Sequence, residues 1–304
     1  MTIRFDGRVA IVTGAGGGLG RQHALALAAR GAAGLVYDLG GTLDGNGSGG
    51  AVTAANAVAE EIRAAGGKAI GNGASVTDPA AVQAMVAAAM KEWGRVDILV
   101  NNAGILRDKS LAKMEIDDFR AVIDVHLMGA VHCTKAVWET MRAQNYGRIV
   151  MTTSSSGLFG NFGQSNYGAA KMALVGLMQT LSIEGAKHDI RVNCLAPTAA
   201  TRMTDKLLPE PMLRLLEAGA VTPGLLALVA EDAPTRAILC AGAGSFERAY
   251  VTLTQGIHVG HDDDTPEQIA ARFDEISSRD DEIVPESGAA QGTIEIGKAM
   301  RAAG

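Results

Sequence analysis

Short apolar runs alternate along this chain with longer stretches in which apolar residues recur at helical spacing. Apolar runs of strand length include "RVAIVTG" (8–14), "GLVYD" (34–38), "RVDILVNNAG" (95–104), "GRIVMTTS" (147–154) and "IRVNCLAP" (190–197). Ala-rich helical segments lie between them. This alternation is typical of a parallel sheet covered by helices on both faces. We therefore expect an α/β fold with a doubly wound, seven-stranded parallel sheet.

The regular pattern weakens toward the C-terminus. We expect one catalytic domain over residues 1–260, within which the less regular segment 198–222 contacts the substrate. The stretch "RAYVTLTQGIHVG" (248–260) predicts a hairpin. Residues 261–304 are acidic and polar, and we interpret them as a C-terminal extension.

Composition and charge argue against several classes of function. The formal net charge is −6 and no cluster of Lys and Arg forms a phosphate-binding face, so nucleic acid is not an expected partner. Three scattered cysteines favour neither disulfides nor a metal site, and they make a cytoplasmic location the default. The sequence shows no signal peptide, no apolar run of about 18 residues and no P-loop, so we expect neither a membrane protein nor a kinase.

A glycine-rich stretch, "TGAGGGLG" (13–20), connects the first predicted strand to the first predicted helix. Gly14, Gly18 and Gly20 permit a tight turn, a close approach of the backbone to a pyrophosphate, and close packing of the helix on the sheet. A glycine string alone is often only a turn. Its position between a strand and a helix favours a Rossmann-like dinucleotide site.

Asp38 ends the second predicted strand, 18 residues after Gly20. A carboxylate at this position accepts hydrogen bonds from the hydroxyls of an adenosine ribose, and its charge repels the additional phosphate of NADP. The alternative is an aspartate that caps a turn. Since no Arg or Lys follows in "YDLGGTLDG", we predict NAD as the cofactor.

Tyr167 and Lys171 lie four residues apart on a predicted helix and therefore share one face of it. A neighbouring ammonium stabilises a phenolate, so we expect Lys171 to lower the pKa of Tyr167 and also to bind the cofactor ribose. Tyr167 then exchanges a proton with an alcohol while the alcohol carbon gives hydride to NAD. Ser154 ends the fifth predicted strand, where its hydroxyl can hold the substrate oxygen.

Together these motifs resemble the short-chain dehydrogenase/reductase family over about residues 5–245. The resemblance rests on "TGAGGGLG", "NNAG" (101–104), Ser154 and "YGAAK" (167–171), in this order and spacing. It implies further cofactor contacts from Leu19, Val76, Asn101, Ala103, Gly104 and Pro197. It also implies that a threonine after the sixth strand binds the carboxamide of the cofactor, for which Thr201 in "APTAATRMT" is the candidate.

A closer resemblance is to the (3R)-hydroxyacyl-CoA dehydrogenase part of type 2 peroxisomal multifunctional enzymes. It is carried by "YDLGG", "VHLMGA", "NCLAPTAATRMT" and "AGAGSF", and by the insertion at 40–50. The chain shows no hydratase domain, no sterol-carrier domain, no terminal Ser-Lys-Leu and no recognised counterpart for 261–304. The usual assembly of the family implies a homotetramer or homodimer that pairs the helices at about 115–143 and 166–187.

His126 departs from the family, most members of which have Asn at this position. There the Asn helps to hold a water molecule in a proton relay from the lysine. His126 in "DVHLMG" retains a polar group for that role and is counted here as a candidate catalytic residue. The alternative is a helix histidine that packs at a subunit interface or bonds a carbonyl.

The motifs predict an NAD-dependent oxidoreductase that interconverts a secondary alcohol and a ketone, and the closer resemblance implies a 3-hydroxyacyl-CoA as substrate. A hydroxysteroid or another hydrophobic alcohol is the alternative substrate. A catalytically silent NAD-binding sensor or scaffold is the alternative from a different class. The apolar stripe in "LLPEPMLRLLEAGAV" (207–221) fits either a helix that closes over a hydrophobic substrate or one that packs in the core.

Overall fold

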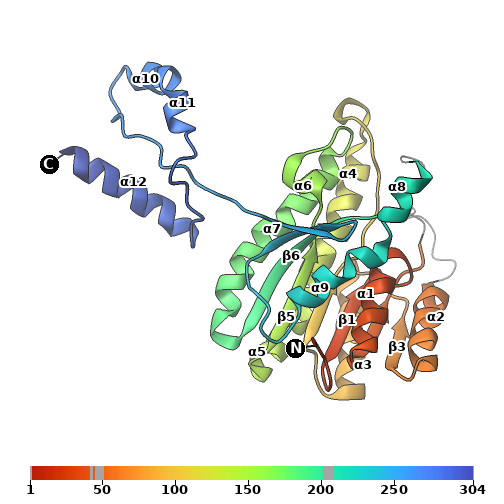
Figure 1. Cartoon of the computed structure of the whole chain (residues 1–304). Coiled ribbons are helices and arrows are strands. Elements are labelled where there is room, and N and C mark those ends of the chain that lie inside the picture. The colour runs from red at the N-terminus through yellow and green to blue at the C-terminus, as the bar shows by residue number, and fades with distance from the viewer. Residues whose placement is uncertain (1, 42–43, 45–50, 201–208, 304) are drawn as a thin grey trace. The chain divides into compact units, whose positions relative to one another are not determined.

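The computed structural model describes residues 2–41, 44, 51–200 and 209–303. They form two compact units, Met1–Arg248 and Ala249–Gly304. The strands are β1 (Val9–Thr13), β2 (Ala33–Tyr37), β3 (Lys68–Asn72), β4 (Ile98–Asn101), β5 (Gly147–Thr152), β6 (Ile190–Thr198), β7 (Ile238–Gly242) and β8 (Ser245–Ala249) (Figure 1). The helices of the first unit are α1 (Gly18–Ala29), α2 (Ala51–Ala64), α3 (Pro79–Trp93), α4 (Ile116–Ile123), α5 (Gly129–Gln144), α6 (Ser155–Phe159), α7 (Ser165–Gly185), α8 (Glu210–Leu215) and α9 (Thr222–Leu228).

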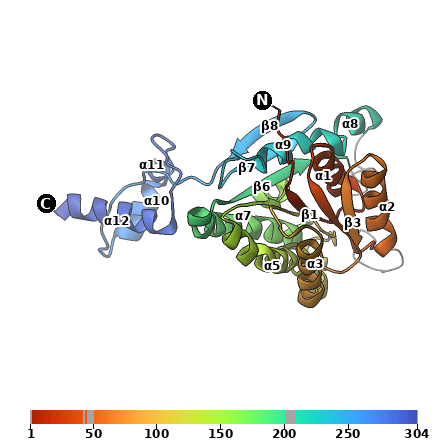
Figure 2. The same ribbon diagram turned by 90° about the horizontal axis from the view of Figure 1, so that it is seen from below.

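One sheet of order β3-β2-β1-β4-β5-β6-β7-β8 forms the centre of the first unit. Every neighbouring pair from β3 through to β7 is parallel. Helices α1, α2 and α9 cover one face of the sheet, and α3, α5 and α7 cover the other (Figure 2). All residues of β1, β4 and β5 are buried, which agrees with their continuous apolar sequences. The predicted doubly wound α/β fold is confirmed.

The sheet contains an eighth strand that the sequence did not suggest. β8 follows β7 after only Ala243 and Gly244, whose φ values of 50° and 77° fit the two-residue turn of an antiparallel hairpin. The hairpin expected over 248–260 is therefore wrong, and the turn lies earlier in the chain. The sequence pattern hid it because every residue of β8 is at least partly exposed, so no alternation of buried and exposed residues marks the strand.

The long helix expected over 115–143 consists of three pieces. α4 passes into a π-helical turn, Asp124–Met128, and α5 then begins at Gly129. A π-turn inserts an extra residue into the helical repeat, and such turns occur frequently at functional sites. This one contains His126, which is 3% exposed.

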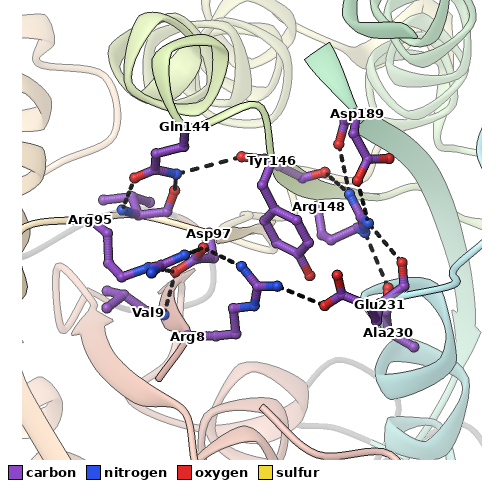
Figure 3. A network of polar contacts seen from close by, with 12 residues as sticks. Arg8, Val9, Arg95, Asp97, Gln144, Tyr146, Arg148, Asp189, Ala230 and Glu231 are labelled. Carbon is purple, nitrogen blue, oxygen red and sulfur yellow. Dashed lines mark hydrogen bonds and ion pairs between the residues drawn. The ribbon is translucent and has the colours of Figure 1, made fainter. Parts of the chain in front are cut away.

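A polar network closes the edge of the sheet at which the strands begin (Figure 3). Asp97, which is fully buried, binds Arg8 and Arg95 at 3.2 and 2.6 Å. The guanidinium groups of Arg8 and Arg148 lie 3.6 and 4.1 Å from the ring centroid of Tyr146. Because these side chains are paired, their charges can be buried without being left isolated. The candidate functional residues lie at the opposite edge of the sheet, where the strands end.

The second unit contains α10 (Thr265–Ala271), α11 (Phe273–Ile276) and α12 (Gly288–Ala303). Leu253 and Ile283 form an isolated antiparallel bridge, and Thr254 Oγ1 donates to the carbonyl of Ile276 at 2.8 Å. The domain boundary expected after residue 260 stays a prediction. Among the described residues, no helix is both long enough and apolar enough to span a membrane.

Buried His23 predicts a loss of stability in acid. Its Nδ1 lies 3.0 Å from the hydroxyl of Thr222, which joins α1 to α9, and burial lowers its pKa to about 3. Because the unfolded chain has the ordinary histidine pKa near 6.5, this contribution is complete above pH 6.5 and is lost as the pH falls. We expect His23 to lower the free energy of unfolding by about 2 kcal/mol between pH 7 and pH 5.

Denaturant unfolding of the chain and of a His23→Gln variant at both pH values measures this effect. The variant should lose less stability than the unmodified chain between pH 7 and pH 5. Some pH dependence of stability should remain in the variant, because burial also lowers the pKa of His126. An equal loss in both proteins would show that His23 does not carry the effect.

Candidate active site

A pocket of about 500 Å³ lies at the edge where the parallel strands end. Several predicted cofactor residues line it: Gly14, Gly18, Leu19, Asp38, Val76, Ala103, Gly104, Tyr167, Lys171 and Pro197. They follow or end different strands, or begin the helices after them, so the parallel topology brings them together although they are distant in sequence. Thr201 lies outside the described residues.

The glycines of the first turn serve different purposes. Gly14 has a φ of +64°, and a Cβ there would lie 2.8 Å from the Cα of Ala103. A Cβ on Gly20 would lie 2.2 Å from the carbonyl oxygen of Gly14, so Gly20 lets α1 pack directly on the loop. This is the close packing that the glycine spacing predicts.

Both carboxylate oxygens of Asp38 are held by backbone donors. The amide of Gly16 donates to Oδ2 at 2.7 Å, and the amide of Gly40 donates to Oδ1 at 2.6 Å. A Cβ on Gly16 would lie 2.8 Å from the Asp38 carboxyl carbon, so this glycine permits the contact. The carboxylate is thereby fixed in the wall of the pocket, and each oxygen keeps lone pairs for a further donor.

Thr13 and Asn102 join the glycine loop to the "NNAG" segment, and the sequence did not single them out. Thr13 Oγ1 accepts hydrogen bonds from the amides of Asn102 and Ala103 at 2.9 and 3.1 Å. The side-chain amide of Asn102 donates to the carbonyls of Thr13 and Gly14. Both residues stand inside the quoted motifs, but residue type and spacing do not reveal which atoms bond across the sheet.

Arg107 is a further pocket residue that the sequence did not indicate. Its Nε donates to the carbonyl of Asp44 at 2.9 Å, and its guanidinium pairs with Asp118 at 3.1 Å. The only signal in the sequence is its position three residues after "NNAG".

Ser154, Tyr167 and Lys171 lie together, Ser154 just after the end of β5 and the other two in the first turns of α7. Ser154 is the N-cap of α6, where its Oγ accepts from the amide of Ser156 at 3.2 Å. Lys171 Nζ lies 5.4 Å from the ring centroid of Tyr167 and donates to the carbonyl of Thr152 at 2.5 Å. The helical spacing of Tyr167 and Lys171 thus gives the shared face that the sequence predicts.

The pKa values in this group differ from the expectation. Burial raises the pKa of Tyr167, and the hydroxyl of Ser154 acts in the opposite direction. Burial also lowers the pKa of Lys171 to about 7. The expected lowering of the tyrosine pKa by the lysine is therefore wrong for this structure. The reason is that both side chains are withdrawn from water, which disfavours the charged form of each.

His126 faces the same group from the π-turn. Its ring meets that of Tyr167 edge to face, with centroids 5.2 Å apart. Its Nε2 lies 3.0 Å from the amide nitrogen and 2.8 Å from the carbonyl oxygen of Ile105. A Cβ on Gly104 would lie 2.3 Å from His126 Cε1, so this glycine makes room for the ring. Burial and the charge of Lys171 hold the pKa of His126 well below its usual value.

The fit between Gly104 and His126 gives a paired prediction. His126→Ala and Gly104→Ala should both lower kcat by about tenfold, since each removes or displaces the ring that packs edge to face against Tyr167, and a tenfold change in rate corresponds to about 1.4 kcal/mol. His126→Asn should retain much of the rate. Steady-state kinetics and cofactor titration measure these effects, and the affinity for the cofactor should change less than kcat. Normal turnover of folded His126→Ala would identify the histidine as a packing residue.

The model for the short chain dehydrogenase family matches residues 8–211. The chain belongs to this family. It is therefore an oxidoreductase of the class that acts on CH–OH groups, as the motifs predicted. Among the described residues, no group of three or more His, Cys, Asp or Glu side chains is placed to hold a metal ion.

Comparison with individual relatives confirms the closer resemblance. The chain is 52% identical over 257 residues to peroxisomal multifunctional enzyme type 2 of Drosophila melanogaster. The aligned residues cover 84% of this chain and 41% of that enzyme. The peroxisomal hydratase-dehydrogenase-epimerase of Saccharomyces cerevisiae is 46% identical over 278 residues, covering 90% of this chain and 30% of that protein. This chain thus spans less than half the length of these two relatives.

Solved structures agree with this family assignment. The full-length Drosophila enzyme superposes with a TM-score of 0.78 at 36% identity, over 96% of this chain and 49% of that one. The aligned part therefore includes some of residues 261–304, for which the sequence suggested no counterpart. A 7α-hydroxysteroid dehydrogenase solved with NADH and 7-oxo glycochenodeoxycholic acid superposes with a TM-score of 0.71 at 27% identity, over 80% of this chain and 95% of that one.

Proposed function

We propose that this chain is an NAD-dependent dehydrogenase that interconverts the 3-hydroxyl and 3-oxo groups of an acyl-CoA. One observation carries the proposal: Tyr167 and Lys171 line the same pocket as the glycine loop and Asp38. The candidate acid–base pair and the glycine loop typical of dinucleotide-binding proteins thus line the same pocket. The choice of an acyl substrate rests on the sequence resemblance to a hydroxyacyl-CoA dehydrogenase, and the word dehydrogenase in the name of the yeast relative agrees with it.

The residues of the pocket fit a dinucleotide with an unmodified ribose. The loop between β1 and α1 has no side chain at Gly14, Gly16 or Gly18 to obstruct a pyrophosphate. Asp38 would accept from the ribose hydroxyls, while Val76 would flank the adenine. NAD, when bound, supplies the acceptor for the hydride.

In the proposed reaction the chain's own residues handle the proton and the substrate oxygen. Ser154 Oγ donates a hydrogen bond to that oxygen, and Tyr167 Oη removes the alcohol proton during oxidation or returns it during reduction. Below its lowered pKa of about 7, Lys171 supplies positive charge beside the ring. His126 takes the position of the relay asparagine and keeps its acceptor role because burial keeps the ring neutral.

The raised pKa of Tyr167 gives a pH prediction. Alcohol oxidation requires the phenolate, so its kcat/KM should increase with pH up to the alkaline range and level off above the tyrosine pKa. Ketone reduction requires the phenol and should be fastest at and below neutral pH. Initial rates in both directions from pH 6 to pH 10 measure this. An oxidation rate that is already maximal at pH 6 would contradict a proton acceptor with a raised pKa.

Exposed apolar side chains that follow the reactive serine in the sequence support a hydrophobic substrate. Phe159 and Phe162, which are 74% and 91% exposed, follow Ser154 at the end of α6 and just beyond it. Leu215 in α8 is also exposed, whereas Val221 is fully buried, and the first apolar residues of the stripe over 207–221 lie outside the described residues. A hydroxysteroid remains the second candidate substrate, because the neighbour solved with a 7-oxo bile acid shares the fold.

A substrate panel tests the proposal. NADH formation is followed by absorbance with (3R)-hydroxyacyl-CoA, (3S)-hydroxyacyl-CoA and 17β-hydroxysteroid substrates. Preferential turnover of one hydroxyacyl-CoA enantiomer supports the proposed substrate class, and preferential turnover of the steroid supports the alternative. Cofactor binding without turnover of any alcohol would instead indicate an NAD-binding sensor or scaffold.

Assembly and location stay predictions. The expected homotetramer or homodimer is tested by light scattering, where a monomer at micromolar concentration would contradict it. The two curated relatives are named as peroxisomal, which differs from the cytoplasmic location predicted from the cysteines. Imaging of the tagged chain in its own cells distinguishes the two.

A further inference from the structure

The loop at 73–78 connects β3 to α3 and forms one wall of the large pocket. Val76 lies at the centre of this loop, is 7% exposed and lines the pocket. The hydrogen bonds within the loop are short-range. The amide of Asp78 donates to the carbonyl of Ser75 at 3.2 Å, and the amide of Thr77 donates to Ser75 Oγ at 3.2 Å. Such bonds shape the turn but do not fix its position relative to the rest of the fold.

Helix α5 supplies a long-range contact to this loop. α3 and α5 cover the same face of the sheet (Figure 2), and His132 Nδ1 in α5 lies 3.0 Å from the carbonyl oxygen of Val76. A carbonyl oxygen can only accept a hydrogen bond, so Nδ1 donates and the ring carries a proton at this atom. A carbonyl outside helices and strands, on a residue withdrawn from water, needs such a partner.

Gly129 receives the side chain of the same valine. It lies three residues before His132 in α5, so the two residues share one face of the helix. A Cβ on Gly129 would lie 2.6 Å from Val76 Cγ2, so the valine packs directly on the helix backbone. Because a β-branched side chain has few χ1 rotamers, fixing the backbone and one methyl group of Val76 also fixes the rest of its side chain.

We propose that His132 is a positioning residue for the adenine end of the cofactor pocket, where with Gly129 it holds Val76 in place before the cofactor binds. The identity of the ligand rests on the proposed function, in which Val76 flanks the adenine. Ordering a loop in advance reduces the entropy lost on binding. The contribution of His132 should therefore appear in the affinity for the adenosine half of the cofactor and not in the rate of hydride transfer.

Calorimetric titration with ADP-ribose, which lacks the nicotinamide, tests this role. His132→Phe keeps an aromatic ring but removes the donor, and we expect it to raise Kd by about three- to tenfold, as one lost hydrogen bond implies. His132→Asn keeps an N–H two bonds from Cβ and should restore most of the affinity. Both variants should keep the unmodified kcat at saturating NAD. An unchanged Kd in folded His132→Phe would overturn the proposal.

His188→Phe is the matched control. His188 is also partly buried, and its Nδ1 lies 3.2 Å from Asn145 Oδ1, but neither residue lines the pocket. The affinity of this variant for ADP-ribose should equal that of the unmodified chain. If His188→Phe weakens binding as much as His132→Phe, the loss reflects general destabilisation and the positioning role is refuted.

Amide hydrogen exchange of the cofactor-free chain tests the position of the loop without any ligand. In His132→Phe the amides of residues 74–78 should exchange faster, because opening of the loop no longer breaks the contact to α5. The amides of α5 itself should keep their rates. Unchanged exchange at 74–78 would contradict the proposal, and an equal increase throughout α5 would show that His132 only stabilises its own helix.

Gly129→Ala serves if His132→Phe does not fold. Its Cβ displaces Val76 without removing a polar atom, and it should raise Kd for ADP-ribose more than it lowers kcat; an unchanged Kd would refute the role of Val76 that the proposal requires. The two claims fail separately. A chain that binds ADP-ribose but turns over no alcohol contradicts the proposed function alone, and an active enzyme in which His132→Phe changes neither Kd nor exchange contradicts this inference alone.

Discussion

Tyr167→Phe should reduce the rate of alcohol oxidation by on the order of 10²–10⁴ while leaving the fold intact, since it removes only the hydroxyl that exchanges the proton. The ring remains to pack against His126 at its present centroid distance of 5.2 Å. Cofactor affinity should change little, because the pocket keeps its other walls. Steady-state kinetics combined with cofactor titration measure both quantities.

Tyr146→Phe is the matched control for this variant. It deletes the same hydroxyl from a buried tyrosine, but at the opposite edge of the sheet, in the network of Arg8 and Arg148. It should turn over at nearly the unmodified rate. Near-normal turnover of folded Tyr167→Phe would remove the tyrosine from the mechanism.

Asp38→Ser combined with Leu39→Arg should raise the preference for NADP over NAD by on the order of 100-fold. The change removes a carboxylate whose charge would oppose the additional phosphate, and it supplies a guanidinium to bind that phosphate. The unmodified chain should use NAD better. The ratio of kcat/KM for the two cofactors measures the preference.

Leu39→Arg alone separates the two contributions. It adds the cation but keeps Asp38, whose oxygens stay fixed by the amides of Gly16 and Gly40. Its preference should therefore lie between those of the unmodified chain and the double variant. If the unmodified chain already prefers NADP, Asp38 does not bind the hydroxyls of the adenosine ribose.

The fold could be predicted from the sequence because its strands are buried on both faces. Continuous apolar runs such as those of β1 and β5 can be recognised as buried strands from the sequence alone. β8 could not be found in the same way, since its residues alternate in neither hydrophobicity nor burial. The π-turn at His126 was equally hidden, because one additional residue per turn leaves the helical periodicity of the flanking segments unchanged.

The candidate site was predicted as a set of positions but not as a set of interactions. Helical spacing placed Tyr167 and Lys171 on one face, and strand ends placed Ser154 and Asp38 at one edge. The direction of the tyrosine pKa could not be derived from spacing, because it depends on how much water reaches the pair. Nor could spacing show that Gly104 accommodates a histidine ring, a contact between segments 22 residues apart.

Transfer of a labelled hydride tests the central claim most directly. The chain is incubated with NAD and a 3-hydroxyacyl-CoA that carries deuterium at carbon 3, using each enantiomer in turn, and the NADH is analysed by mass spectrometry. We predict that with one enantiomer the NADH gains one deuterium, and that Tyr167→Phe forms this labelled NADH far more slowly. Unlabelled NADH, or no NADH from either enantiomer, would contradict direct hydride transfer from the proposed substrate.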